Sequence, residues 1–313
     1  MIRRNEYLMA NNYVKYKLEL EGFGCEVRAD EPMKNHTSFK IGGSADLFVT
    51  VSDKGQLTSV IGLCRDNAIP LFILGNGSNL LVSDNGIRGV VLRLSGEFCD
   101  IRFNDDGTLH CGAGAQLSRL CAFALDNSLT GLEFAWGIPG SCGGAAFMDA
   151  GAYGGEMKDV VISCEHVDIR TGECGVFAGE ELDFAYRHSV YSGGGYVITA
   201  LNLRLEKGEK EEIRAKMDDL MGRRKDKQPL DFPSAGSIFK RPVGYFAGGL
   251  IEQCGLKGAR VGGAQVSPKH AGFIVNVGGA TCEDVLGLIE MIQKTVREGT
   301  GVELECEVRK TGE

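Results

Sequence analysis

A glycine-dense run between Phe134 and Gly155 is the segment of this chain best suited to chemistry. The run is apolar, contains no Lys or Arg, and carries Trp136, Phe147 and Tyr153. Linkers are polar and flexible, whereas glycine lets a backbone come within contact of a ligand, and aromatic rings need burial or a flat partner. Bare backbone amides beside aromatic rings suit a phosphate-bearing aromatic cofactor.

A second glycine-rich stretch, Gly-Asn-Gly-Ser-Asn at residues 75–79, separates two apolar, strand-like runs. A dinucleotide fingerprint needs a helix after the glycine turn, and a P-loop needs Gly-Lys-Ser or Gly-Lys-Thr, so both are excluded. Successive N–H groups in such a turn can cradle a pyrophosphate without a basic side chain. Taken alone, the turn is more often a plain hairpin, but the second glycine segment favours the phosphate-binding interpretation.

Short strands and helices are expected to position these segments. Alternation and apolar runs predict strands at 47–51, 71–74, 90–94 and 197–205, while helical spacing predicts helices around 57–64 and 117–124. A charged helix around Ile213 ends before Gln228-Pro229, where a domain boundary fits. Another helix is predicted from Thr281, as its cap, to Gly299, as its stop. Residues 302–308 alternate apolar and charged side chains, which predicts a closing strand with one ionic face.

Composition limits the classes of function. The 313 residues allow two or three domains, and 43% hydrophobic with 24% charged residues is typical of a soluble globular protein. A net charge of −8 argues against a nucleic-acid or anionic-membrane surface. No apolar run approaches the roughly 20 residues of a membrane helix, and the first residues lack the apolar core of a signal peptide, so we expect a cytoplasmic protein.

Metal chemistry has little support in the sequence. The eleven cysteines form no Cys-x-x-Cys pair, and the five histidines show no His-x-x-x-His spacing. We therefore expect reduced, mostly buried thiols and no metal, and any electron transfer needs an organic carrier.

Three side chains could carry a reaction, although each has a plain structural interpretation. Arg187 could be a surface ion-pair partner, but a planar guanidinium can also hold a carboxylate by two bonds. Ser237 could be a helix-cap or turn serine, and Glu307 could belong to a solvated sheet face. The residue types alone leave these alternatives open.

Six ordered motifs between residues 35 and 310 resemble those of one flavoprotein family. They are Asn35-His-Thr-Ser-Phe-Lys-Ile-Gly-Gly-Ser-Ala-Asp, Leu74-Gly-Asn-Gly-Ser-Asn-Leu-Leu, Gly137-Ile-Pro-Gly-Ser-Cys-Gly-Gly-Ala, Tyr186-Arg-His-Ser, Ala235-Gly-Ser-Ile-Phe-Lys and Glu307-Val-Arg. In this order they are similar to the UDP-N-acetylenolpyruvoylglucosamine reductases of peptidoglycan synthesis.

The resemblance implies an α+β fold of the vanillyl-alcohol-oxidase type, in which FAD lies between two α+β lobes and a third domain closes over the substrate. It implies a first FAD-binding lobe at 1–94, to which residues 301–313 return at the FAD and substrate cleft. A second FAD-binding lobe would cover 95–226 and a substrate-binding domain 227–300. The sequence does not determine the oligomeric state, and a monomer is compatible with it.

The resemblance also implies roles for single residues. Arg187 would face the substrate carboxylate and the flavin, Ser237 would donate a proton to carbon, and Glu307 would stabilise the developing charge together with Arg187. Substrate-binding roles fall to Tyr186, Lys227, Lys240 and Arg241; for the three basic residues, solvated surface charge is the alternative. The residues implied to bind FAD are Gly75, Asn76, Gly77, Ser78, Asn79, Leu80, Gly137, Ile138, Pro139, Gly140, Ser141, Gly143, Gly144, Ala145, Gly151 and Ala152.

The implied reaction is the NADPH-dependent reduction of the enolpyruvyl ether of UDP-N-acetylglucosamine to UDP-N-acetylmuramate through FAD. Hydride would reach the terminal methylene, negative charge would move into the carboxylate, and Ser237 would protonate the adjacent carbon. The residues do not distinguish NADPH from NADH. Two alternatives remain: another flavin-dependent oxidase of the same fold, and a catalytically silent protein that binds nucleotide sugars.

The chain departs from the family pattern in two places. Asp149 stands where related sequences commonly have asparagine, so an amide donor becomes an acceptor-only carboxylate if it is ionised. Residues 191–196 leave little room for the tyrosine-bearing insertion of the longer subtype, so the chain resembles the shorter one. How the sugar nucleotide is capped without that insertion stays open.

Overall fold

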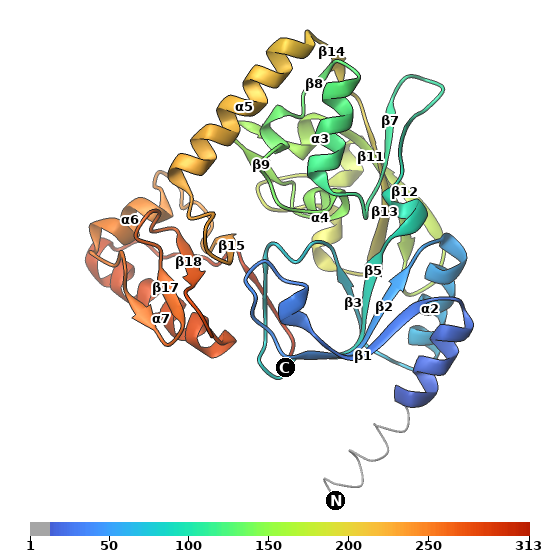
Figure 1. Ribbon diagram of the computed structural model, residues 1–313, viewed down its shortest axis with the longest axis horizontal. Coiled ribbons are helices and arrows are strands. Elements are labelled where there is room, and N and C mark those ends of the chain that lie inside the picture. Colours follow the sequence, from blue (N-terminus) through green and yellow to red (C-terminus); the bar gives the residue numbers. More distant parts are fainter. Residues whose placement is uncertain (1–12) are drawn as a thin grey trace, which may run out of the picture. The chain divides into compact units, whose positions relative to one another are not determined.

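The computed structural model describes residues 13–313 as a mixture of helices and strands (Figure 1), which confirms the α+β class. The expected lack of a signal segment concerns residues 1–12 and lies outside the described residues. The chain divides into two compact units, each assembled from separate segments. Unit 1 contains the residues up to Glu31, Asp46–Asn76 and Gly89–Met221, and unit 2 contains Pro32–Ala45, Gly77–Arg88 and Gly222–Glu313. The three-domain division stays a prediction.

The first sheet has the strand order β1-β2-β5-β3. Its strands are β1 (Glu26–Pro32), β2 (Ser44–Val51), β5 (Ile87–Leu94) and β3 (Leu71–Leu74), so the strands predicted at 47–51, 71–74 and 90–94 are confirmed. Strand β3 runs parallel to β5, with Leu71 opposite Val90. Helix α2 (Lys54–Asp66) follows β2 in the chain. It begins after Asp53, whose side chain accepts a hydrogen bond from the Gln56 amide, and its apolar face is buried, as the helical spacing predicted.

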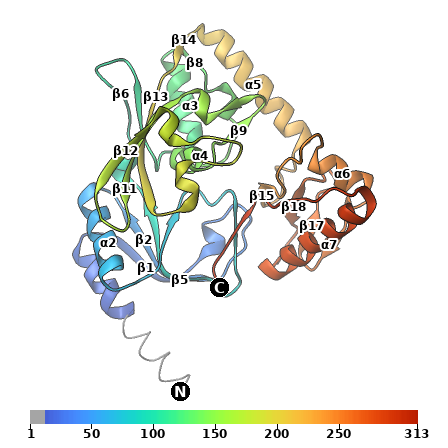
Figure 2. The same cartoon turned by 180° about the vertical axis from the view of Figure 1, so that it is seen from behind.

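The second sheet of unit 1 is antiparallel throughout. Its strands lie in the order β12 (Cys174–Ala178), β11 (Val161–Asp168), β13, β7 (Leu109–Gly112) and β6 (Ile101–Phe103). Figures 1 and 2 both show the helices α3 (Leu117–Asp126) and α4 (Cys142–Phe147) on the same face of this sheet. Strand β13 (Tyr196–Leu203) confirms the strand predicted at 197–205. Buried side chains of both sheets and both helices form one continuous hydrophobic core, so the two sheets stabilise each other.

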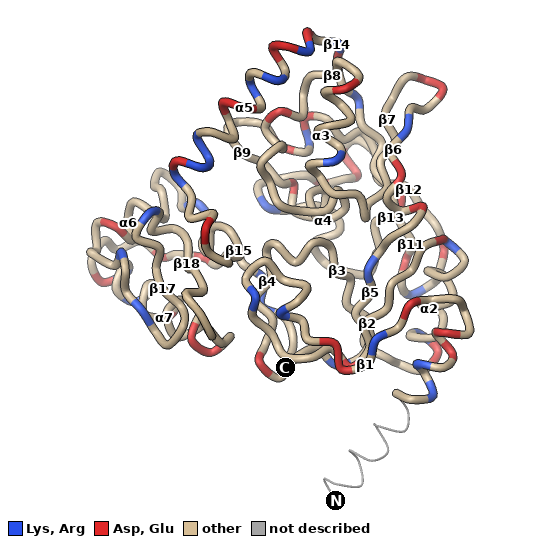
Figure 3. Tube along the Cα trace, in the orientation of Figure 1, with Lys and Arg blue, Asp and Glu red and all other residues tan. Residues whose placement is uncertain are grey.

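Helix α5 (Lys210–Lys227) confirms the predicted charged helix that ends before Gln228. Figure 3 shows Lys and Arg alternating with Asp and Glu along its length. Among its side chains only Ile213 and Met217 are buried, so the helix is mostly solvated. The division between the two units falls inside it, after Met221.

Unit 2 is built around a second hydrophobic core and an antiparallel sheet. The strands of this sheet lie in the order β15 (Ser234–Ser237), β18 (Phe273–Asn276), β17 (Ala264–Val266) and β16 (Arg260–Val261). Helix α7 (Cys282–Thr300) packs against β16 and β17. The Thr281 hydroxyl accepts a hydrogen bond from the Asp284 amide, which confirms the predicted cap. The predicted stop at Gly299 is wrong by two residues. Gly301, with φ of 73°, ends the helix because a residue without Cβ adopts the left-handed conformation without strain.

Two expectations about strands need correction. The stretch 302–308 is not a regular strand: it makes one isolated bridge, between Cys306 and Phe239, and regular pairing begins only at β19 (Arg309–Thr311). Leu304 and Val308 are nevertheless buried while Glu303 and Glu305 are exposed, as the alternation predicted. The plain-hairpin alternative for residues 75–79 is also wrong. Strand β3 pairs with β5, whereas β4 (Leu80–Val82) pairs with β19.

The remaining helices and strands are short. The strands are β8 (Leu129–Thr130), β9 (Gly151–Ala152), β10 (Gly155–Glu156) and β14 (Glu206–Lys207). The helices are α6 (Ala247–Gln253), the helical residues 13–22, and the 3-10 turns η1 (Met33–Asn35), η2 (Gly96–Cys99), η3 (Glu133–Ala135), η4 (Met157–Asp159), η5 (Gly179–Leu182) and η6 (Val190–Gly193).

Candidate active site

Gly75, the first residue of the 75–79 segment, lies close to the second glycine-rich segment inside unit 1. A Cβ atom added at Gly75 would lie 2.6 Å from the Ser141 Oγ and 3.9 Å from the Gly144 Cα. Only a glycine permits so close an approach at position 75. The structure therefore joins two stretches that are distant in sequence.

Part of the second segment is scaffold. The amides of Cys142 and Gly143 donate to the carbonyls of Ala115 and Ala113, each at 2.8 Å. A Cβ at Gly143 would lie 2.8 Å from that of Ala113, so this glycine is needed for packing. Ser141 precedes α4 and accepts a hydrogen bond from the Gly144 amide at 3.2 Å.

Other amides in the two segments remain available. Residues 76–79, Gly137, Gly140 and Ser141 lie outside the helices and strands. In the part of the chain that the structure describes, their N–H groups donate no hydrogen bond to a backbone carbonyl. Amides without backbone partners, next to glycines that admit close approach, are the groups that hold a pyrophosphate. Each segment by itself therefore has donors suited to the phosphate part of a dinucleotide.

The rest of the second segment turns sharply. Asp149 and Tyr153 have φ values of 42° and 55°, and β9 then pairs with β10, with Gly151 opposite Glu156. The Asp149 side chain is fully buried. Its Oδ1 accepts from the Lys158 amide at 2.8 Å, whereas Oδ2 has no hydrogen-bond partner among the described residues. Burial raises the pKa of this carboxyl.

Arg187 lies in unit 1 at the tip of a tight turn. Ala185 and His188 exchange two backbone hydrogen bonds across the turn, and Arg187 has a φ of 57°. Its guanidinium carbon is 4.9 Å from the centre of the Tyr186 ring. A left-handed conformation in a long side chain is costly, and such strain concentrates at functional sites.

Ser189 anchors that turn, and the sequence did not single out its contact. The residue is fully buried, and its hydroxyl donates to the Phe147 carbonyl at 2.8 Å and accepts from the Tyr191 amide at 3.3 Å. The hydroxyl thus links the Arg187 turn to the end of α4. Such a contact between distant segments leaves no signal in the local sequence pattern.

Ser237 and Glu307 lie on neighbouring extended segments of unit 2. The Glu307 amide donates to the Ile238 carbonyl at 2.7 Å, and the Ser237 hydroxyl donates to the Phe239 carbonyl at 3.0 Å. The Asn79 side-chain amide donates to the Glu307 carbonyl at 3.1 Å. Unit 2 therefore brings together residues from three separate motifs: Ser237, Glu307 and Asn79.

The predicted substrate-binding residues have varied surroundings. The Lys240 ammonium donates to the Glu305 carboxylate, and the Arg241 guanidinium lies 4.1 Å from the centre of the Phe246 ring. Lys227 is the last residue of α5, and Tyr186 is about half exposed beside Arg187. Lys227, Lys240 and Arg241 belong to unit 2, whereas Tyr186 belongs to unit 1.

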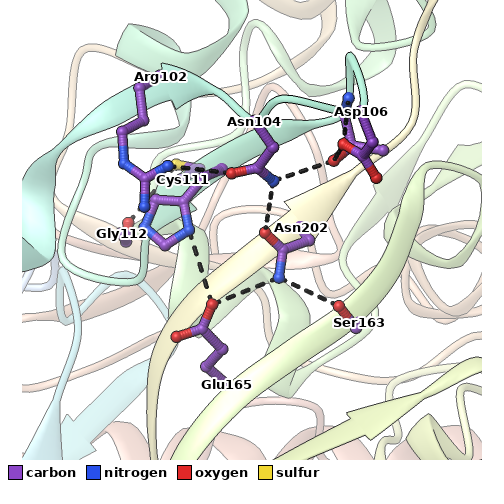
Figure 4. Close-up of polar contacts among 10 residues, drawn as sticks. Arg102, Asn104, Asp106, Cys111, Gly112, Ser163, Glu165 and Asn202 are labelled. Atoms are coloured by element: carbon purple, nitrogen blue, oxygen red, sulfur yellow. Dashed lines mark hydrogen bonds and ion pairs between the residues drawn. The ribbon is translucent and has the colours of Figure 1, made fainter.

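A polar network on the second sheet of unit 1 has the residue types of an acid–base site (Figure 4). The His110 Nδ1 lies 3.7 Å from the Glu165 Oε1, and Asn104 donates to the Asn202 side chain, which donates to Ser163. Burial is the main cause of a lowered pKa at His110. Because these groups satisfy one another's hydrogen bonds, the network stabilises the sheet.

Searches of the described residues give two further findings. No group of three or more His, Cys, Asp or Glu side chains that could hold a metal ion is found there. In the same residues, no helix combines the length and the apolar character that crossing a membrane requires.

Comparison with known proteins defines the class first. Residues 45–176 match the family model of an FAD binding domain, and this range contains both glycine-rich segments. The protein is therefore an FAD-binding flavoprotein, and the predicted cofactor FAD and the FAD-binding fold are confirmed.

The remaining matches define the family. Residues 228–311 match the model "UDP-N-acetylenolpyruvoylglucosamine reductase, C-terminal domain". The chain is 53% identical to the UDP-N-acetylenolpyruvoylglucosamine reductase of Alkaliphilus oremlandii (strain OhILAs), over 92% of this chain and 94% of that protein. The corresponding protein of Clostridium novyi (strain NT) is 50% identical, over 92% and 93%. The crystal structure of the Thermus caldophilus reductase is similar with a TM-score of 0.78 and 38% identity, covering 92% of this chain and 99% of that one. The chain belongs to the UDP-N-acetylenolpyruvoylglucosamine reductase family.

Proposed function

We propose that this protein reduces the enolpyruvyl ether of UDP-N-acetylglucosamine to UDP-N-acetylmuramate with electrons from NADPH, a step in peptidoglycan precursor synthesis. The observation that carries the proposal is the identity of about one half with reductases of that name across both units of the chain. NADPH, in preference to NADH, is part of the proposal, as are a cytoplasmic location and a monomeric state.

FAD would be held mainly through backbone amides. Residues 76–79, Gly137, Gly140 and Ser141 would supply N–H groups for its pyrophosphate, with Gly75, Leu80, Ile138 and Pro139 as their neighbours in the two segments. Gly143, Gly144 and Ala145 would maintain the close packing of that region. Gly151 and Ala152 follow on the strand that leaves the Asp149 turn. When bound, FAD supplies the hydride acceptor and donor that no side chain of the protein can replace.

Arg187 would hold the substrate carboxylate. A guanidinium forms two parallel hydrogen bonds to a carboxylate, and its charge stabilises negative charge that develops there. The strained turn and the Ser189 anchor support this role because they fix the backbone from which Arg187 extends.

Ser237 would protonate the carbon next to the carboxylate, and Glu307 would donate a hydrogen bond to that carboxylate in its protonated form. Their positions on paired segments support a shared role. Arg187 belongs to unit 1 and the other two to unit 2, so the proposed reaction needs groups from both. Tyr186, Lys227, Lys240 and Arg241 would bind the rest of the substrate, with residues 227–300 as the substrate-binding domain and 1–94 and 95–226 as the FAD-binding lobes.

An anaerobic absorbance experiment tests the proposal. NADPH should bleach the flavin band of the purified protein, and the enolpyruvyl UDP-sugar should restore it. Recovery only with oxygen would favour a flavin oxidase, and a protein that does not bleach with NADPH would favour the silent binding protein. Either result contradicts the proposal.

A substitution tests the proton donor. Ser237→Ala should retain FAD and its reduction by NADPH, but slow reoxidation by the substrate about 100-fold or more, since general acid catalysis contributes that much. Ser234→Ala, in the same strand β15, is the matched control and should reoxidise at the wild-type rate. Normal reoxidation of Ser237→Ala would remove Ser237 from this role.

A further inference from the structure

Strand β15, which carries Ser237, lies at one end of the sheet of unit 2 and is irregular. Its pairing with β18 shifts register between Ser234 and Ser237, and Gly236 between them has a φ of 76°. A bulged edge strand has fewer ladder hydrogen bonds to fix its position than a central strand has. The position of Ser237 therefore also depends on contacts along the outer edge of β15.

One contact on this outer edge comes from Ser38. The Asn276 amide of β18 donates to the Pro233 carbonyl at 2.9 Å, and successive carbonyls of an extended chain point to opposite sides. The next carbonyl, that of Ser234, accordingly points away from β18. It accepts a hydrogen bond from the Ser38 hydroxyl at 2.7 Å.

Ser38 extends from a backbone that is itself fixed within unit 2. Its neighbours Thr37 and Phe39 are buried, and the Thr37 hydroxyl donates to the Ile41 carbonyl at 3.0 Å. The Asn276 side chain donates to the Phe39 carbonyl at 3.1 Å. A side chain on a fixed backbone can determine where its hydrogen-bond partner lies.

The same residue contacts the turn at residues 75–79, the proposed site of the FAD pyrophosphate. The Ser38 amide donates to the Gly77 carbonyl at 3.1 Å. A Cβ atom added at Gly77 would lie 2.1 Å from the His36 carbonyl oxygen, so this glycine packs directly on the segment that carries Ser38. Ser38, Gly77 and β15 all belong to unit 2. Ser38 thus links the turn, through its backbone, to β15, through its hydroxyl.

We propose that Ser38 is a positioning residue for the proton donor, because its hydroxyl fixes the strand from which Ser237 extends. The inference rests on the proposed function, in which Ser237 protonates carbon. Ser38 acts through Ser237 and takes no part in the chemistry itself. Because Ser38 also holds the turn at Gly77, FAD bound to that turn should stabilise β15 as well.

Reoxidation of the reduced, FAD-loaded protein by the enolpyruvyl substrate tests this role. Ser38→Ala keeps the amide bond to Gly77, so FAD should be retained and its reduction by NADPH unchanged. Reoxidation should slow about tenfold with little change in KM, since one hydrogen bond that positions the donor is lost. Ser38→Thr keeps the hydroxyl and should reoxidise at nearly the wild-type rate. Thr295→Ala removes a hydroxyl that donates to the Met291 carbonyl within α7, and is the matched control.

A double substitution shows whether Ser38 acts through Ser237. In the Ser237→Ala background the proton donor is already absent, so adding Ser38→Ala should slow reoxidation less than about twofold further. An equal loss in both backgrounds would overturn the inference, because Ser38 would then act independently of Ser237. Wild-type reoxidation of Ser38→Ala would overturn it too.

Hydrogen exchange supplies a measurement that does not depend on the substrate. FAD should slow exchange of the β15 amides in the wild type, and Ser38→Ala should reduce this protection about tenfold while leaving the α7 amides unchanged. Equal β15 exchange in Ser38→Ala and wild type would contradict the inference, and loss of FAD from Ser38→Ala would assign the residue to the cofactor site instead. The proposed function fails separately, when wild-type reduced flavin is not reoxidised by the enolpyruvyl substrate.

Discussion

At the scale of single residues, Asp149 is a carboxylic acid in a buried environment. It is fully buried, and one of its carboxylate oxygens has no partner among the described residues. Burial is the first cause of its raised pKa, Glu156 and Asp159 add to it, and Lys158 opposes it through both its amide and its charge. A protonated Asp149 becomes a donor at Oδ2 and in this respect resembles an asparagine amide.

We predict that Asp149→Asn stabilises the protein at neutral pH. A raised folded-state pKa means that the folded protein holds this proton more tightly than the unfolded chain does. The contribution of Asp149 to stability is therefore complete below the unfolded-state pKa of about 3.9 and is lost as pH rises through the folded-state value. The gain from asparagine should be small at pH 4 and reach about 1 kcal/mol at pH 7, the scale of one buried polar group.

Thermal unfolding of the FAD-free protein at several pH values measures this gain. Asp105→Asn, at an exposed loop position of the same unit, is the control and should change little at any pH. A difference between Asp149→Asn and wild type that shrinks as pH rises would show that the buried carboxyl is stabilised as an anion.

The sequence identified the candidate residues through motifs, but not all of their contacts. Gly75 and Ser141 were each predicted in glycine-rich segments, and the structure joins them. The hydrogen bond from Ser189 to Phe147 and the buried Asp149 oxygen depend on how distant segments pack. A local pattern carries no information about such packing.

At the scale of elements, the N-terminus of α7 also depends on a contact with a distant segment, which a local sequence pattern does not predict. The sequence predicted the Thr281 cap, because a hydroxyl before an apolar helical stripe is a local signal. A second cap comes from Asp84, whose carboxylate accepts hydrogen bonds from the Cys282 amide at 2.9 Å and the Glu283 amide at 3.2 Å. Asp84 lies about 200 residues away in the chain, so no helix-boundary rule could find it.

We predict that Asp84→Ala lowers the free energy of unfolding of the α7 region by about 1–2 kcal/mol, because two helix amides lose their acceptor and the helix dipole loses a nearby negative charge. Hydrogen exchange of the α7 amides should therefore become faster by about tenfold or more, the factor that corresponds to 1.4 kcal/mol. Glu290→Ala, at an exposed position of the same helix, is the control. Equal exchange in the two variants would mean that Thr281 alone caps the helix.

Helices and strands were predicted correctly where the residues of the element itself determine its conformation. The helix α5 and the strand β3 were found because charge distribution and apolar runs are local. The closing strand at 302–308 was wrong because alternation reports which side chains are buried, not whether a neighbouring strand supplies regular pairing. In this chain the segment 237–240 provides only one bridge, at Phe239.

At the scale of the whole molecule, unit 2 is discontinuous. Its core contains Phe39, Ile41 and Leu81, all at most 2% exposed, together with side chains of the C-terminal segment. Strand β4 pairs with β19, and the Asn276 side chain donates to the Phe39 carbonyl. The family model at residues 228–311 covers none of these N-terminal partners.

We predict that residues 228–313 alone do not form a stable fold. Three buried side chains of this size contribute roughly 5–9 kcal/mol in total, which is comparable with the entire stability of a typical domain. The isolated fragment should give a poorly dispersed amide NMR spectrum and no cooperative thermal transition, whereas the full chain should protect the α7 amides from exchange. A well-dispersed spectrum with a cooperative transition would show instead that the C-terminal segment holds its own core, and that residues 32–45 and 77–88 dock onto a domain already folded. Residues 32–45 and 77–88 precede the second sheet of unit 1 in the chain, whereas the rest of unit 2 follows it. The prediction therefore also implies that unit 2 completes its fold only after the C-terminal segment is available.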